Sequence, residues 1–149
     1  MRIALFQPDI AGNVGTILRT AACLGVGVDL IEPMGFAFSD RALARAGMDY
    51  AAKAEVVRHV DWDAFVAAVP GRIMLLTTRG GVRLNGATFA SDDTLLFGSE
   101  GAGVPDAVHS RADAAVFVPM RSGFRSLNVA VTAAMVLGEA LRQTGGWPD

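Results

Sequence analysis

The stretch TLLFGSEGAGVP, residues 94–105, decides the fold class. It starts as a short and almost entirely apolar strand, Thr94–Phe97, and continues into a loop with three glycines in six positions. Strands of this kind are typical of a parallel sheet that is buried on both faces. Glycine lets the backbone approach a ligand closely and adopt positive φ. The stretch therefore predicts an inner strand of an α/β sheet with a ligand-binding loop at its carboxyl end.

The sequence on both sides alternates short apolar strands with helical patterns. Strands are predicted at Met1–Phe6, Val28–Ile31, Ala54–Val57, Arg72–Thr77, Thr94–Phe97 and Ala115–Val118. Helices are predicted at Thr16–Leu24 with Asn13 as N-cap, Asp40–Ala46, Trp62–Val69 with Asp61 as N-cap, and about Leu127–Arg142 with Ser126 or Asn128 as N-cap. This alternation predicts an α/β fold, a mostly parallel sheet with helices on both faces. Since no internal repeat or linker is visible, we expect one domain over residues 1–149.

The composition favours a globular protein that acts in the cytoplasm. The chain is 52% hydrophobic and 19% charged, and its apolar runs fall short of the roughly 18–20 residues that a membrane span needs. Gln7, Pro8 and Asp9 interrupt the apolar N-terminus too early for a signal peptide. The single cysteine, Cys23, excludes an internal disulfide and a cysteine-based zinc cluster, and its apolar neighbours predict a buried thiol. We therefore expect neither a membrane nor a metal as partner.

The net charge of −2 requires that any nucleic-acid site be a local basic patch. The basic residues are nearly all arginines, since Lys53 is the only lysine. Arginine suits bidentate phosphate contacts and stacking on bases.

Three strand ends are the candidate ligand sites, because ligands of α/β sheets bind outside the carboxyl ends of the strands. They are Thr77-Thr78, Gly98–Gly103 and Pro119–Asn128. The glycine loop lacks the spacing of a dinucleotide fingerprint, and no Walker lysine follows it. These absences disfavour a nucleotide-dependent oxidoreductase. Free amides at the start of the last predicted helix would favour an anionic group.

Three motifs in this order resemble those of the SPOUT superfamily of RNA methyltransferases. They are Asn13-Val14-Gly15 followed by Arg19, Leu96–Glu100 followed by Gly103 and Pro105, and Val118–Met120 leading to Ser126–Val129. The resemblance implies a deep C-terminal trefoil knot that binds S-adenosylmethionine. It implies cofactor contacts at Leu76, Thr77, Gly98, Val118, Met120 and Ser126.

The resemblance also implies catalytic roles for Arg19, Glu100 and Asn128. Arg19 would act on the proton of the attacking hydroxyl, either as a base or by stabilising the developing alkoxide. The active site would be composite and completed across a homodimer with twofold symmetry. An apolar face on the last helix fits the core of one chain or a dimer interface equally well; it comprises Val129, Ala133, Val136, Leu137 and Ala140.

Two further segments resemble the branch that methylates the wobble ribose of tRNA, namely Ile31–Phe36 and Arg45–Tyr50. This implies 2′-O-methylation of the wobble cytidine or modified uridine in the anticodon loop of leucine tRNAs. Ser99 and Ala130 depart from the residues usual in that branch, proline and serine. Two alternatives stay open: a ribose methylase for another tRNA position or for ribosomal RNA, and an RNA-binding module without catalysis.

An RNA-contacting surface is predicted from basic and aromatic residues near these motifs. Arg41 and Arg45 share one face of a predicted helix at i and i+4. The other members of this surface are Tyr50, Lys53, Arg121 and Arg125.

Overall fold

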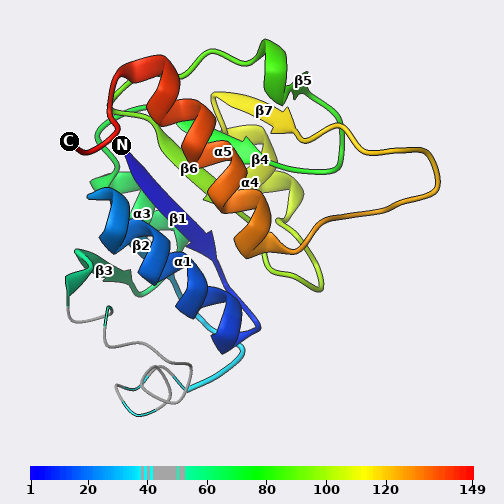
Figure 1. The fold of residues 1–149 in the computed structure, drawn as a ribbon. Coiled ribbons are helices and arrows are strands. Elements are labelled where there is room, and N and C mark those ends of the chain that lie inside the picture. The colour runs from blue at the N-terminus through cyan, green and yellow to red at the C-terminus, as the bar shows by residue number, and fades with distance from the viewer. Residues whose placement is uncertain (38, 40, 42–49, 51–52) are drawn as a thin grey trace.

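The computed structural model describes the chain except for residues 38, 40, 42–49 and 51–52 (Figure 1). In the described part, seven strands form one sheet in the order β3-β2-β1-β6-β4-β7-β5, and every neighbouring pair is parallel. The strands are β1 (Arg2–Phe6), β2 (Gly27–Ile31), β3 (Val56–His59), β4 (Ile73–Leu76), β5 (Val82–Arg83), β6 (Thr94–Phe97) and β7 (Ala114–Phe117). The α/β prediction is confirmed.

Helices cover both faces of the sheet (Figure 1). They are α1 (Ala11–Leu24), α3 (Trp62–Ala68), α4 (Asp106–Arg111) and α5 (Val129–Thr144), with a short 3-10 helix η2 (Leu84–Gly86). On one face α1 and α5 pack against each other and enclose the larger apolar core. On the other face α3 and α4 contribute Phe65 and Val108 to a smaller core. Strand β6 is therefore buried on both sides, as its apolar sequence predicts.

The structure shows where the apolar face of the last helix packs. Four of the five residues of the predicted apolar face, Ala133, Val136, Leu137 and Ala140, are buried in the core of this chain, and Val129 is partly buried against it, so this face packs within the chain. The exposed large apolar residues of α5 are Val131 and Met135, one turn apart, and Leu127 precedes them at the same spacing. Near the end of α5, hydrogen bonds from Arg142 and Gln143 lower the pKa of Glu139 to about 2.

Some sequence predictions are wrong in detail. Helix α1 begins before Asn13: its N-cap is Ile10, whose side chain cannot cap the helix, and the Asn13 side chain donates to Glu100 instead. Cys23 is exposed. The strand predicted at Ala54–Val57 begins two residues later. Elements too short to show a periodicity, α4, β5 and η2, were not predicted. The caps at Asp61 and Asn128 are confirmed, and most of the helix predicted at Asp40–Ala46 lies outside the described residues.

In the described part of the chain, no helix is both long and apolar enough to cross a membrane.

Candidate active site

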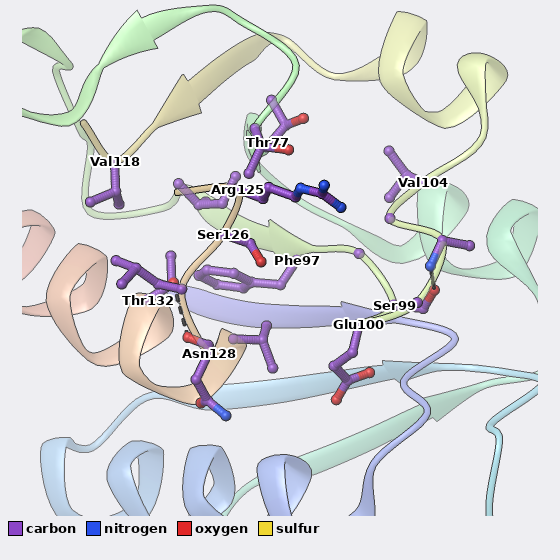
Figure 2. A pocket seen from close by; sticks show the side chains of 18 of the residues that line it. Thr77, Phe97, Ser99, Glu100, Val104, Val118, Arg125, Ser126, Asn128 and Thr132 are labelled. Carbon is purple, nitrogen blue, oxygen red and sulfur yellow. Dashed lines mark hydrogen bonds between the residues drawn. The ribbon is translucent and has the colours of Figure 1, made fainter. Parts of the chain in front are cut away.

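A cavity of about 630 Å³ opens at the carboxyl ends of β4, β6 and β7 (Figure 2). Its walls are the end of β4 with the segment that follows it (Leu76–Arg79), the loop after β6 (Gly98–Val104) and the segment that leads into the first residue of α5 (Arg125–Val129). This volume lies within the range of pockets that bind small molecules and cofactors. All three strand ends selected from the sequence thus meet at one site.

The loop after β6 has a tight backbone conformation that depends on glycine. Ser99 and Gly103 exchange two backbone hydrogen bonds, of 3.0 and 2.8 Å. A Cβ atom on Gly98 would lie 2.5 Å from the carbonyl carbon of Gly103, and Gly103 itself has a φ of 66°. The close approach of these two residues leaves the Gly98 backbone facing the cavity.

Three segments that are distant in sequence are joined by hydrogen bonds of side chains beside the cavity. The Asn128 amide donates to the Asn13 amide oxygen (3.0 Å), and the Asn13 amide donates to Glu100 Oε1 (3.0 Å). The second carboxylate oxygen, Glu100 Oε2, accepts from the backbone N–H of Asp9 (2.8 Å). These hydrogen bonds hold Glu100 in one orientation and join the start of α5 to the first turn of α1.

Asn128 also caps α5. Its Oδ1 atom accepts from the backbone N–H groups of Ala130 (2.9 Å) and Val131 (3.2 Å). The prediction that these amides are free for an anionic ligand is therefore wrong, since the capping side chain already satisfies them. The Thr132 hydroxyl, which faces the cavity, donates to the Asn128 carbonyl oxygen (Figure 2).

All six residues predicted to contact the cofactor line the cavity, namely Leu76, Thr77, Gly98, Val118, Met120 and Ser126. They combine apolar side chains with two hydroxyl groups and the backbone of Gly98. The Thr77 backbone N–H donates to the Val116 carbonyl (3.0 Å), and its hydroxyl accepts from the Arg79 N–H (3.0 Å). Such a lining can hold a flat apolar group together with polar substituents.

The predicted catalytic residues are only partly brought together. Glu100 and Asn128 line the cavity, whereas Arg19 does not. Arg19 is exposed on α1, and its guanidinium carbon lies 4.7 Å above the centre of the Tyr50 ring. It follows Asn13 by six residues, or about 9 Å along the helix axis, and points to a different face.

The predicted RNA-contacting residues are distributed over more than one place. Arg125 lines the cavity, and Figure 2 shows its side chain extending across the opening toward Val104. Arg41, Lys53 and Arg121 are exposed. Tyr50 contacts Arg19, and Arg45 lies outside the described residues.

Sequence reasoning missed three residues of the site. Arg79 lines the cavity and forms an ion pair with Asp106 (2.8 Å), which lowers the pKa of that exposed carboxyl group. Its place at the end of β4 was the available signal. Asn13 belongs to the first motif but was interpreted as a cap. No sequence signal marked Asp9, because its contacts are made to residues 91 and 92 positions away.

Among the described residues, no cluster of His, Cys, Asp or Glu could hold a metal ion.

The chain matches known proteins over nearly its whole length. A tRNA (cytidine(34)-2'-O)-methyltransferase of Beijerinckia indica is 55% identical over 146 residues, covering 96% of this chain and 91% of that protein. A solved structure that concerns the 2-OH methylation of C/U34 on tRNA has a TM-score of 0.90 and 40% identity, covering 95% of this chain and 94% of the other. The SpoU methyltransferase AviRb of Streptomyces viridochromogenes, solved in complex with AdoMet, has a TM-score of 0.83 and 26% identity, covering 96% of this chain and 57% of the other. The model of the SpoU rRNA Methylase family matches residues 1–138, and the chain belongs to this family.

Proposed function

We propose that this protein transfers a methyl group from S-adenosylmethionine to the ribose 2′-hydroxyl of the wobble nucleotide of tRNA. The observation that carries the proposal is the cavity at the ends of β4, β6 and β7, flanked by the Asn128–Asn13–Glu100 hydrogen bonds. The names of the relatives support the choice of reaction and nucleotide, since one is a tRNA (cytidine(34)-2'-O)-methyltransferase and another structure concerns C/U34 of tRNA.

The cavity fits S-adenosylmethionine in size and chemistry. Gly98 packs so closely on Gly103 that it has no room for a side chain, and its backbone lines the cavity, where a ligand can contact it. Leu76 and Val118 offer apolar contacts for an adenine ring, and the hydroxyls of Thr77 and Ser126 offer polar ones. The AviRb structure contains AdoMet, which supports the same cofactor here.

When bound, S-adenosylmethionine supplies an electrophilic methyl group on a sulfonium sulfur. The residues of the protein must hold the ribose oxygen in line with that methyl group, a positioning effect that can contribute about 7–11 kcal/mol. They must also receive the hydroxyl proton as the carbon–oxygen bond forms and the carbon–sulfur bond breaks. Glu100 and Asn128 are the fixed polar groups at the cavity that we assign to this positioning.

Arg19 would come from the partner subunit of a homodimer. In one chain it lies on a different face of α1 from Asn13 and outside the cavity lining. A second copy would cover the exposed apolar residues Leu127, Val131 and Met135, which are 42%, 52% and 45% exposed and lead away from the cavity along α5. A guanidinium delivered there would stabilise the developing alkoxide electrostatically.

The finer features of the proposal rest on the motif resemblance. We propose one domain over residues 1–149 and a C-terminal trefoil knot, in which the segment between β7 and α5 passes through a loop before α5 returns to pack on α1. We also propose that the protein acts on leucine tRNAs in the cytoplasm. The residues that we propose to contact the anticodon loop are Arg41, Arg45, Tyr50, Lys53, Arg121 and Arg125.

The test is transfer of a labelled methyl group from S-adenosylmethionine to total tRNA, followed by mapping of the modified nucleotide. The expected product carries a 2′-O-methyl group on nucleotide 34 of leucine tRNA. Labelling of another tRNA position or of ribosomal RNA would refute the proposed substrate but would be consistent with the proposed methyl transfer. Cofactor binding without transfer to any RNA would refute the proposed activity.

A further inference from the structure

Asp9 holds the catalytic loop without lining the cavity. Its backbone N–H donates to Glu100 Oε2 (2.8 Å), and its own carboxylate oxygen Oδ2 accepts from the N–H of Gly101 (3.2 Å). One residue of the loop between β1 and α1 thus binds two consecutive residues of the loop after β6. Asp9 is exposed and is not among the residues that line the cavity, so it acts on a ligand only through its neighbours.

A third segment supports Asp9 from the other side. The backbone N–H of Gly35 donates to the Pro8 carbonyl oxygen (2.9 Å). A Cβ atom on Gly35 would lie 3.0 Å from Asp9 Cα and 3.0 Å from Asp9 Oδ1. Met34 and Phe36, on either side of Gly35, pack against the larger core and fix the segment. The Met34–Phe36 segment therefore limits where Asp9 can lie.

We propose that Asp9 is a positioning residue that sets the orientation of the Glu100 carboxylate, and that the Met34–Phe36 segment holds Asp9 in place. The proposal rests on the methyl transfer proposed above. Asn13 binds one oxygen of Glu100 and the backbone N–H of Asp9 binds the other. The Asp9 carboxylate accepts from Gly101 and so keeps that backbone N–H against Glu100; without the carboxylate the second contact loosens and Glu100 is held firmly at one oxygen only. A carboxylate held at one point can rotate, and a misplacement of about 1 Å at a catalytic group can reduce a rate by about 100-fold.

The main variant is Asp9→Ala, which removes the acceptor for the Gly101 N–H, and the conservative variant is Asp9→Asn, which keeps an acceptor oxygen. We expect Asp9→Ala to lower the single-turnover rate of methyl transfer by about 10-fold, because the loop that carries Glu100 loosens. The Kd for S-adenosylmethionine should stay within about 2-fold, because Asp9 does not reach the cavity. Asp9→Asn should recover most of the rate.

A second pair of variants tests the support. Gly35→Ala should displace Asp9 and give the same pattern, a lower rate with nearly unchanged cofactor affinity. Gly86→Ala is the matched control, because its Cβ atom would meet only Val82 Cγ1 at an ordinary 3.9 Å.

The outcomes separate the two proposals. A wild-type rate in Asp9→Ala overturns the positioning role. The role is also overturned if Asp9→Ala weakens cofactor binding by the same factor as it lowers the rate and lowers the melting temperature as well. That pattern marks a purely structural residue. Absence of transfer by the unmodified protein overturns the proposed function and this inference with it, whereas the first two results overturn the inference alone.

Discussion

A mixing experiment with two inactive variants tests whether Arg19 acts across a dimer. Arg19→Ala removes the guanidinium but leaves the cavity of its own subunit intact, because Arg19 does not line it. Glu100→Ala alters the cavity but leaves Arg19 on its own surface. A heterodimer of the two then contains one site with an intact cavity and an intact arginine, provided that the arginine comes from the partner.

The expected recovery follows from counting the sites. Random association of equal amounts makes half of the dimers mixed, and each mixed dimer has one complete site out of two, so roughly a quarter of the sites become active. If Arg19 served its own subunit, one half of the mixed dimer would lack the arginine and the other would lack Glu100. The mixture would then recover nothing.

Both variants should fold, since neither removes a buried apolar group. Arg19→Ala loses an exposed stacking contact with Tyr50, worth about 0.5–1 kcal/mol. Glu100→Ala removes the acceptor of two hydrogen bonds, from Asp9 and Asn13. Because water can replace these contacts at the cavity edge, we expect a loss of about 1–2 kcal/mol in the free energy of unfolding.

The assay is transfer of labelled methyl groups to tRNA by each variant and by the mixture, with differently tagged subunits to measure the mixed dimer. Calorimetry should show that Arg19→Ala binds S-adenosylmethionine nearly as well as the unmodified protein. Mixed dimers that recover no activity above the sum of the single variants would refute the composite site. Sedimentation of the unmodified protein as a monomer would refute it as well.

Three other predictions concern the loop, the hydrogen-bond chain and the last helix. Gly98→Ala should lower stability by about 1–3 kcal/mol through overpacking and weaken cofactor binding measured by calorimetry, whereas Gly86→Ala should do neither; equal behaviour of the two would contradict the close packing. At neutral pH the melting temperature of Asn13→Asp should be lower than that of Asn13→Ala, because the aspartate places a second carboxylate against Glu100. A higher melting temperature for Asn13→Asp would indicate a helix cap, where aspartate is favourable. The pKa of Glu139 is lowered from its usual 4.5 to about 2 in the folded protein, so its contribution to stability is present above pH 4.5 and is lost as the pH falls toward 2. The difference in melting temperature between wild type and Glu139→Gln should therefore shrink over that interval. A constant difference would contradict the shift.

The alternation of strands and helices was predictable because burial dictates residue type locally. β6 and β4 are covered on both faces, and apart from Thr94 their residues are apolar. The carboxyl-end rule then selected the three loops that line the cavity. By contrast, α4 and β5 are too short for a periodic pattern, and they form because neighbouring elements pack against them.

The sequence by itself determined the order of the longer strands and helices and, through its motifs, the family and the loops that line the cavity. Only the tertiary structure decided what Asn13 and Asp9 do. From the local sequence, an asparagine at the start of a helix predicts a cap, because a capping side chain bonds to backbone groups only two or three positions away. The actual partners of these two residues, Glu100 and Asn128, lie 87 to 115 positions distant, and only the folding of β1 beside β6 and of α1 against α5 brings them within hydrogen-bonding distance.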